Sequence, residues 1–87
     1  MIGKQIRLFI KPYCGWCREA QEWLDQRNVQ YETLDVTNNA DAYKEMVSLS
    51  GQHKAPVMDF NGEVLADFGV DELEVFWKEN GLDGGQG

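Results

Sequence analysis

Residues 6–17 of this 87-residue chain read IRLFIKPYCGWC. The first five are mostly branched or aromatic apolar residues, a composition typical of a short strand buried on both faces. Cys14 and Cys17, the only two cysteines of the chain, follow three positions apart and open a segment with helical periodicity. A thiol pair at the start of a helix, directly after a strand, is the arrangement that produces a reactive dithiol.

The expected position of Cys14 at the first helical turn explains why this spacing suits thiol chemistry. The thiolate is the attacking species, and the unpaired amides and dipole at a helix N-terminus favour a negative charge. Lys11 and Arg18 add positive charge nearby. Cys17 lies one turn later, close enough to attack a mixed disulfide at Cys14. We expect Cys17 to be the more buried and less acidic thiol.

Three roles without redox catalysis stay open for the cysteine pair. A structural disulfide is possible, although a bridge across so short a loop constrains the unfolded chain very little. Half of a zinc site is also possible, but zinc takes four ligands and the chain offers only His53 to join the thiols, unless two chains share the site. Two inert buried cysteines are the third, and the neighbours Pro12, Gly15 and Arg18 argue against a dry core there.

Size and composition predict one small domain. The chain is 43% hydrophobic with 11% aromatic residues, which is enough for a hydrophobic core that needs no disulfide bond or metal ion to stabilise it. No apolar run approaches the length of a membrane span, and no signal-peptide pattern is visible. A reducing compartment favours a catalytic over a structural cysteine pair. We therefore expect a cytoplasmic protein that does not act at a membrane.

The net charge of −7 argues against nucleic-acid binding. The charge is also unevenly distributed, with basic residues concentrated in the first third of the chain and acidic residues in the last third. Most of these side chains are expected on solvated faces. The functional alternative is a more positive rim around the thiols, which would suit an anionic thiol substrate.

Periodicity and turn signals predict seven elements. They are a strand at 5–10, a helix at 15–28, a strand at 29–36, a helix at 40–50, strands at 56–60 and 63–66, and a helix that begins at Asp71 and stops at Asn80-Gly81. Asn61-Gly62 is a strong hairpin signal, and Asp71 with Glu74 resembles a capping box.

The predicted fold is therefore α/β, in the order β-α-β-α-β-β-α. The first two strands are joined by a right-handed parallel crossover, and an antiparallel hairpin completes a four-stranded mixed sheet flanked by three helices. The domain is expected to cover residues 1–81. The Gly-rich residues 82–87 are expected to form a flexible tail.

Over about residues 4–80 the chain resembles the glutaredoxins, small members of the thioredoxin-fold class. Residues 11–17, KPYCGWC, resemble the family's active-site segment, and Ala20 with Trp23-Leu24 falls where the family's first helix packs. Residues 55–57, APV, match the family's Thr-Val-Pro region, in which the proline is cis. Residues 67–73, DFGVDEL, lie where glutaredoxins carry a Gly-Gly turn and an Asp pair at a helix start. The resemblance implies a thioredoxin-like fold.

The resemblance also implies a glutathione-binding site around Cys14. Lys11 would pair with the glycine carboxylate of glutathione, Gln52 would supply a second contact to that carboxylate, and Tyr13 would flank the sulfur. The alternative for Lys11 is a solvated charge.

Two further segments complete the implied glutathione site. Ala55 would bond the backbone of the glutathione cysteine, in a segment that continues through Pro56 and Val57. Asp71, with the backbone at Val70, would hold the γ-glutamyl end at a helix N-terminus, where free amides bind anions. The alternatives are an ordinary trans proline that begins an edge strand and an Asp71 that only caps its helix.

The family resemblance and the dithiol together imply a thiol-disulfide oxidoreductase. It would reduce glutathione mixed disulfides or protein disulfides, with Cys14 as nucleophile, and Cys17 or glutathione would resolve the mixed disulfide. Glutathione would be a co-substrate, disulfide-containing proteins would be partners, and we expect a monomer with no metal and no tightly bound cofactor.

The departures from the family pattern favour two alternatives. Gly15 replaces the usual Pro, Trp16 replaces the usual Tyr, Phe68-Gly69 replaces Gly-Gly, and Lys54 stands where Thr is common. The pattern around Phe68 also resembles the redoxins that serve ribonucleotide reductase and take electrons from thioredoxin reductase. Glutaredoxins with Gly at the position of Gly15 can bridge a [2Fe-2S] cluster between subunits. Trp16 is expected to be exposed at the rim of the active site, where it would either form part of a docking surface for a protein partner or cover Cys17.

Overall fold

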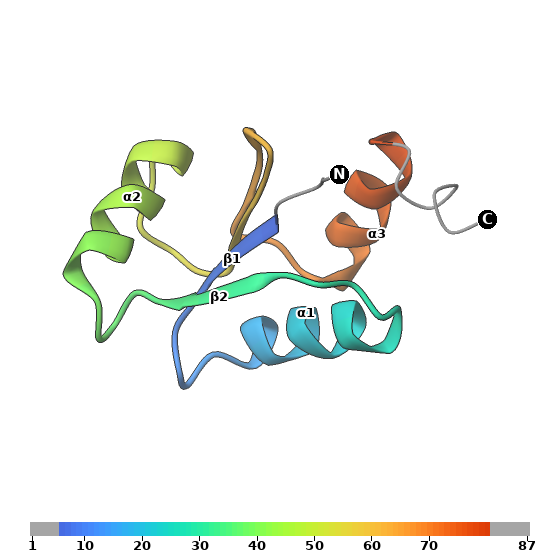
Figure 1. Ribbon diagram of the computed structural model, residues 1–87, viewed down its shortest axis with the longest axis horizontal. Coiled ribbons are helices and arrows are strands. Elements are labelled where there is room, and N and C mark those ends of the chain that lie inside the picture. The colour runs from blue at the N-terminus through green and yellow to red at the C-terminus, as the bar shows by residue number, and fades with distance from the viewer. Residues whose placement is uncertain (1–5, 81–87) are drawn as a thin grey trace.

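The elements of the protein follow the predicted order β-α-β-α-β-β-α in a computed structural model that describes residues 6–80 (Figure 1). Their bounds are β1 Ile6–Ile10, α1 Gly15–Gln26, β2 Glu32–Asp35, α2 Ala40–Ser50, β3 Val57–Phe60, β4 Glu63–Ala66 and α3 Val70–Glu79. The predicted tail at 82–87 and the predicted domain limits lie outside the described residues.

The four strands form one mixed sheet in the order β2-β1-β3-β4. β1 pairs in parallel with β2 and antiparallel with β3, which in turn pairs antiparallel with β4. Phe9 on β1 therefore lies between Leu34 on one side and Val57 on the other. The prediction of a parallel crossover joined to an antiparallel hairpin in a thioredoxin-like fold is confirmed.

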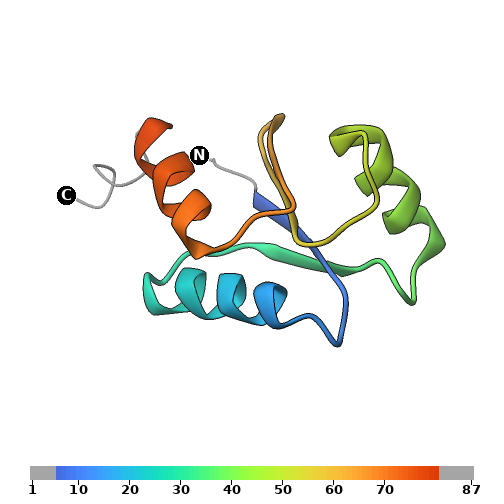
Figure 2. The same ribbon diagram turned by 180° about the vertical axis from the view of Figure 1, so that it is seen from behind.

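Two apolar cores cover the two faces of the sheet. α1 and α3 lie beside one another on one face, and α2 covers the other (Figures 1 and 2). The larger core contains Ile6, Leu8, Ala20, Trp23, Leu24, Met58, Phe68, Leu73 and Trp77, and the smaller contains Phe9, Val36, Ala42, Met46 and Val57. Across residues 6–80, none of the helices is long and apolar enough to cross a membrane.

The hairpin between β3 and β4 forms at the predicted residues. Asn61 and Gly62 both have positive φ, 49° and 96°, which the tight turn of a two-residue hairpin requires. Asp59 stabilises the turn, because its Oδ1 accepts the Gly62 N–H at 2.8 Å. The predicted end of the second helix at residue 50 is also confirmed, since Gly51, with φ 73°, ends α2 in the left-handed conformation.

The segment between the first helix and the second strand differs from the prediction. α1 ends at Gln26 and β2 begins at Glu32, so neither element includes residues 27–31. Asn28 takes a left-handed φ of 57°, which stops the helix, and the Val29 N–H donates back to the Leu24 carbonyl at 3.1 Å. This closure turns the chain before it can pair with β1.

The start of the last helix also corrects the prediction. α3 begins at Val70, with Gly69 as its N-cap residue, one position before the predicted start at Asp71. The acidic side chain that reaches back belongs to Glu72, whose Oε1 accepts the Gly69 N–H at 2.9 Å. The predicted pairing of Asp71 with Glu74 is therefore wrong, because the cap lies two positions earlier, at a residue that has no side chain.

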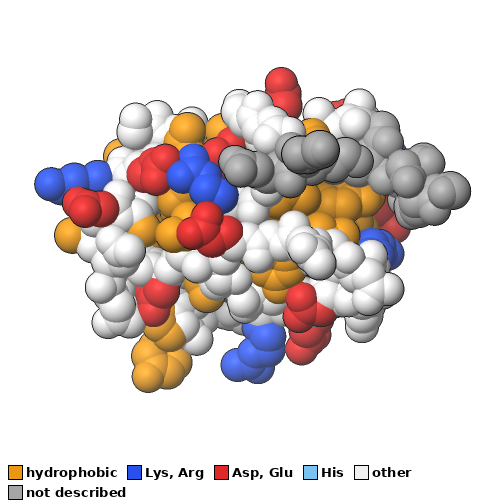
Figure 3. Space-filling view, in the orientation of Figure 1, with side chains coloured by type: hydrophobic (Ala, Val, Ile, Leu, Met, Phe, Trp, Pro, Cys, Tyr) orange, Lys and Arg blue, Asp and Glu red, His pale blue; other side chains and the backbone are white. Residues whose placement is uncertain are grey.

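Arg7 and Asp59 are not the solvated charges that the composition suggested. They lie opposite each other on β1 and β3, and Arg7 Nη2 donates to Asp59 Oδ2 at 2.7 Å. Arg7 Nη1 also contacts Glu45 of α2 at 2.7 Å. Figure 3 shows basic and acidic side chains gathered beside α2 on this face. These charges tie α2 to the sheet away from the thiols.

Candidate active site

Cys14 is the N-cap residue of α1 and presents its sulfur to the first helical turn. Its backbone is extended, with φ −118° and ψ 112°, and its Sγ accepts the backbone N–H of Cys17 at 3.1 Å. The first turn of α1 contains no acidic residue. The positive end of this helix is therefore available to stabilise a negative charge on Cys14.

Cys17 is buried beneath Cys14, as predicted. The residue is 1% exposed, and the structure contains both cysteines as free thiols. Burial, followed by a hydrogen bond with Cys14, raises the pKa of Cys17 from 9.0 to about 12. A smaller contribution from the Lys11 backbone lowers it. Cys17 is thus a protonated thiol at neutral pH while Cys14 is reduced.

The Ala55–Val57 segment lies beside the thiols, at the start of β3. The peptide bond between Ala55 and Pro56 is cis, as the family resemblance implied. Cys14 Sγ lies 4.0 Å from the Ala55 carbonyl oxygen. Pro56 and Val57 are buried, so a ligand at this segment would meet backbone atoms.

The three residues predicted to surround the glutathione carboxylate have different surroundings. Tyr13 is fully exposed and Lys11 is half-buried. Gln52 is engaged within its own loop, because its Nε2 donates to the Lys54 carbonyl at 2.9 Å and its Oε1 accepts the Lys54 N–H at 2.7 Å. Gln52 therefore has a bracing role in the loop that the sequence did not indicate.

A hollow of about 340 Å³ opens where α1 and α3 begin. We call it the α1–α3 hollow, and its lining consists of Trp16, Glu19, Gly69, Val70, Asp71 and Glu72. Trp16 is 55% exposed, which confirms its predicted place at the rim. The predicted ligand residues Val70 and Asp71 meet Trp16 here, although more than fifty positions separate them in the sequence.

The charge of the α1–α3 hollow is opposite to that of the positive rim considered from the sequence. Three of its six lining residues are carboxylates, and none is Lys or Arg. The sequence showed only that Glu19 follows Cys17 by two positions. Nothing local indicated that Asp71 and Glu72 of a distant helix would face the same hollow.

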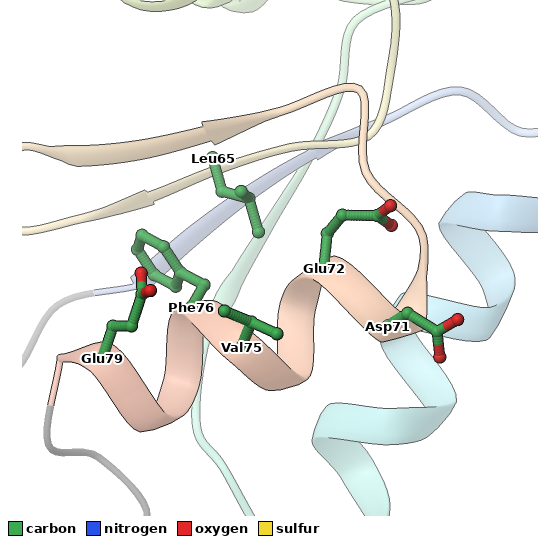
Figure 4. Close-up of a pocket in the computed structure, with 6 residues that line it drawn as sticks. All are labelled: Leu65, Asp71, Glu72, Val75, Phe76 and Glu79. Carbon is green, nitrogen blue, oxygen red and sulfur yellow. The ribbon is translucent and has the colours of Figure 1, made fainter.

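A second hollow, of about 370 Å³, continues along α3 toward the sheet edge. Figure 4 shows Leu65 of β4 pointing toward α3, with carboxylates along the helix. This β4–α3 hollow is also lined by Val75, Phe76 and Glu79, and it shares Asp71 and Glu72 with the α1–α3 hollow. One side of α3 therefore presents an acidic surface with apolar side chains between its charges.

No group of three or more His, Cys, Asp or Glu side chains is arranged to hold a metal ion among residues 6–80. His53, the one histidine, is exposed in the loop after α2.

Comparisons with known proteins agree with this geometry. The model of the glutaredoxin family matches residues 6–65. A glutaredoxin-like 8.6 kDa protein in the rubredoxin operon of Clostridium pasteurianum is 29% identical over 69 residues, which cover 79% of this chain and 92% of that relative.

Solved structures share the same fold. The crystal structure of the thioredoxin-like protein BC3987 is 30% identical with a TM-score of 0.74, and the match covers 79% of this chain and 94% of that one. The buckwheat glutaredoxin–glutathione complex is 23% identical with a TM-score of 0.62, over 72% of this chain and 60% of that one. This second likeness concerns the fold.

Proposed function

The chain belongs to the glutaredoxin family, and from this premise we propose that it is a thiol-disulfide oxidoreductase in which Cys14 attacks and Cys17 resolves. The observation that carries the proposal is the hydrogen bond of 3.1 Å from the Cys17 amide to Cys14 Sγ, above a buried second thiol. The two sulfurs have unequal surroundings, and the two steps of disulfide exchange need such unequal partners.

The proposed reaction transfers two electrons from the dithiol to a substrate disulfide. The Cys14 thiolate attacks one substrate sulfur, the substrate S–S bond breaks, and the leaving thiolate takes a proton from solvent. Cys17 then loses its proton and attacks Cys14 Sγ, which releases the second substrate thiol. A Cys14–Cys17 disulfide remains, and an external thiol reductant must return two electrons to it.

The proposed substrates are glutathione mixed disulfides or protein disulfides, with glutathione as co-substrate. Ala55, whose carbonyl lies 4.0 Å from Cys14 Sγ, supports a peptide-like ligand at this point. The buckwheat glutaredoxin was solved in complex with glutathione, which adds support from the same fold. The proposed glutathione contacts are Lys11, Tyr13, Gln52, Ala55, Pro56, Val57, Val70 and Asp71.

A protein reductant of the thioredoxin reductase type is the second candidate. The thioredoxin-like relative BC3987, at 30% identity, favours it. The two donors can be compared by offering the oxidised protein NADPH with either glutathione and glutathione reductase, or thioredoxin reductase alone. NADPH consumption in only one of the two assays identifies the donor. We place the reaction in a reducing compartment, the cytoplasm, where a monomer of this size would serve disulfide-containing proteins.

The central test compares Cys14→Ser with Cys17→Ser. Because the first exchange step needs the Cys14 sulfur, Cys14→Ser should lower the rate of disulfide reduction by roughly a thousandfold or more. Cys17→Ser should retain the first step and accumulate a mixed disulfide that mass spectrometry detects. Circular dichroism controls for folding of both variants. Full activity in Cys14→Ser would contradict the proposal.

A further inference from the structure

We propose that the α1–α3 hollow selects protein disulfides whose reacting cysteine is flanked by Lys or Arg. This inference rests on the proposed function, because it names the substrate class of Cys14. It concerns the disulfide that is reduced and leaves the identity of the final reductant open. Trp16, Glu19 and Asp71 are the specificity-determining residues.

The position of the hollow puts it within reach of a substrate chain bonded to Cys14. Trp16 stands two residues after Cys14 in the first turn of α1. The start of α3 lies against its ring, since a Cβ at Gly69 would stand 4.0 Å from Trp16 Cε3. An extended chain advances about 3.3 Å per residue. A substrate side chain one or two positions from the reacting cysteine can therefore enter the hollow.

The carboxylates of the hollow differ in how far they are already engaged. Glu72 accepts the Gly69 N–H at 2.9 Å, so part of its charge serves the start of α3. Glu19 and Asp71 are exposed, and neither belongs to the ion pairs formed within residues 6–80. Two carboxylates thus remain to attract a cation into the hollow.

Trp16 supplies an apolar surface beside those two carboxylates. Trp16 as a residue is 55% exposed, and a Lys ammonium or Arg guanidinium gains energy over an indole face. A cation in the hollow would therefore meet an aromatic ring as well as negative charge. The glutathione part of a mixed disulfide has two carboxylates and one ammonium group, a net charge of −1, and gains less from such surroundings.

The test uses peptides of equal length that have one cysteine in disulfide linkage with a fluorescently labelled cysteine. The residues on both sides of the peptide cysteine are Lys in one peptide and Glu in the other. The rate of label release by the reduced protein is measured without any reductase, and each rate is divided by the rate with dithiothreitol to remove intrinsic reactivity. At low ionic strength we expect the Lys peptide to react roughly tenfold faster than the Glu peptide.

Matched double variants show where the preference originates. Glu19→Gln/Asp71→Asn should reduce the ratio to about threefold, and high salt should reduce it in the unaltered protein. Glu32→Gln/Glu63→Gln removes the same charge at the end of the sheet away from the thiols, and should leave the ratio near tenfold.

The outcomes separate this inference from the proposed function. Equal corrected rates for the two peptides, or an equal loss of preference in both double variants, would overturn the selectivity while leaving the oxidoreductase intact. Absence of release from either peptide, although dithiothreitol reacts with both, would overturn the proposed function itself.

Discussion

α1 and α3 begin at one hollow, and their first turns differ in side-chain charge. The first turn of α1 contains no acidic residue and gives the Cys17 amide to Cys14 Sγ. The first turn of α3 contains Asp71 and Glu72, and Glu72 already occupies the Gly69 amide. One helix end is therefore free to stabilise a new anion, while the other has its own carboxylates.

The difference indicates that the N-terminal ends of α1 and α3 have different roles, although their local geometry is similar. Both helix ends have unpaired amides and a positive dipole end. On α1 these groups act on Cys14 Sγ, the proposed nucleophile. On α3 they are compensated within the protein, so the outward effect of that end is the negative charge of Asp71 and Glu72. The side chains of the first turn, more than the helix itself, decide what each end attracts.

The largest expected effect comes from the core that anchors both helices. Leu73 of α3 is fully buried in the same core as Leu24 of α1. Leu73→Ala should lower the free energy of unfolding by about 2–5 kcal/mol, because it removes buried methyl groups and leaves a cavity. Urea unfolding measures the loss. The control Val75→Ala, on the same helix but 54% exposed, should change stability by less than about 0.5 kcal/mol. Equal losses would show that α3 is not anchored through this core.

The second prediction concerns the pH dependence of stability that arises from Cys17, the buried thiol of α1. The folded-state pKa of Cys17, about 12, is above its ordinary value of 9.0. The stability from its protonated form is therefore complete below pH 9 and lost as the pH rises toward 12, by at most about 1.4 kcal/mol per pH unit. Urea unfolding under reducing conditions between pH 8 and 11 measures this slope, and Cys17→Ala should reduce it.

The background slope for that experiment has a known source. Burial and a hydrogen bond to Asp25 raise the pKa of Tyr31 from 10.0 to about 12, so Tyr31 also reduces stability above pH 10. The Tyr31 contribution remains in Cys17→Ala and cancels in the comparison. Identical slopes in the two proteins would mean that Cys17 is not kept protonated by its burial.

The third prediction makes the start of α1 resemble the start of α3. Gly15→Asp introduces a carboxylate into the first turn, where an added Cβ has nothing within 4 Å. Repulsion between two charges a few ångströms apart in a wet site is worth about 1 kcal/mol. Alkylation of Cys14 by neutral iodoacetamide at pH 7 should therefore slow about fivefold. Gly15→Asn should slow it much less, and similar rates for Asp and Asn would refute the role assigned to this helix end.

The smallest expected effect comes from removing the Glu72 carboxylate, which accepts the Gly69 N–H at the start of α3. Glu72→Ala deletes the acceptor of the Gly69 N–H and should lower the free energy of unfolding by roughly 0.5–1 kcal/mol. Glu72→Gln keeps an acceptor oxygen and should cost less. Thermal or urea unfolding distinguishes the two. A larger loss in Gln than in Ala would show that the bond to Gly69 is not what Glu72 contributes.

Sequence reasoning succeeded where the signal lies within a few residues. Asn61-Gly62 predicted the hairpin because few residue pairs adopt two successive positive φ angles. The helical periodicity that follows Cys14 predicted a helix from residue 15, where α1 begins, and Cys17, Ala20 and Leu24 on this helix are buried. The family resemblance, not local pattern, supplied the cis peptide bond before Pro56.

The failures have a common physical cause. Local pattern predicts the wrong N-cap residue for α3 because Gly69 has no side chain that could accept a capping hydrogen bond. The observed capping contact is made by Glu72, which accepts the Gly69 N–H. Composition suggests solvated charges at Arg7 and Asp59 because their pairing depends on the register of two strands far apart in the sequence. The acidic hollow has no local signal because Glu19 and Asp71 line it together only after α1 and α3 have packed.

Local sequence determines the order of elements, the turn residues and the thiol pair at the start of a helix. Hydrophobic periodicity, backbone preference and helix-end chemistry all act over one or two turns of chain, so they can be recognised from neighbouring residues. The ion pair across the sheet and the acidic lining of the α1–α3 hollow came from packing alone. Burial and charge proximity are properties of distance in space. Only the folded chain brings the beginnings of α1 and α3 together and so sets the charge of the hollow between them.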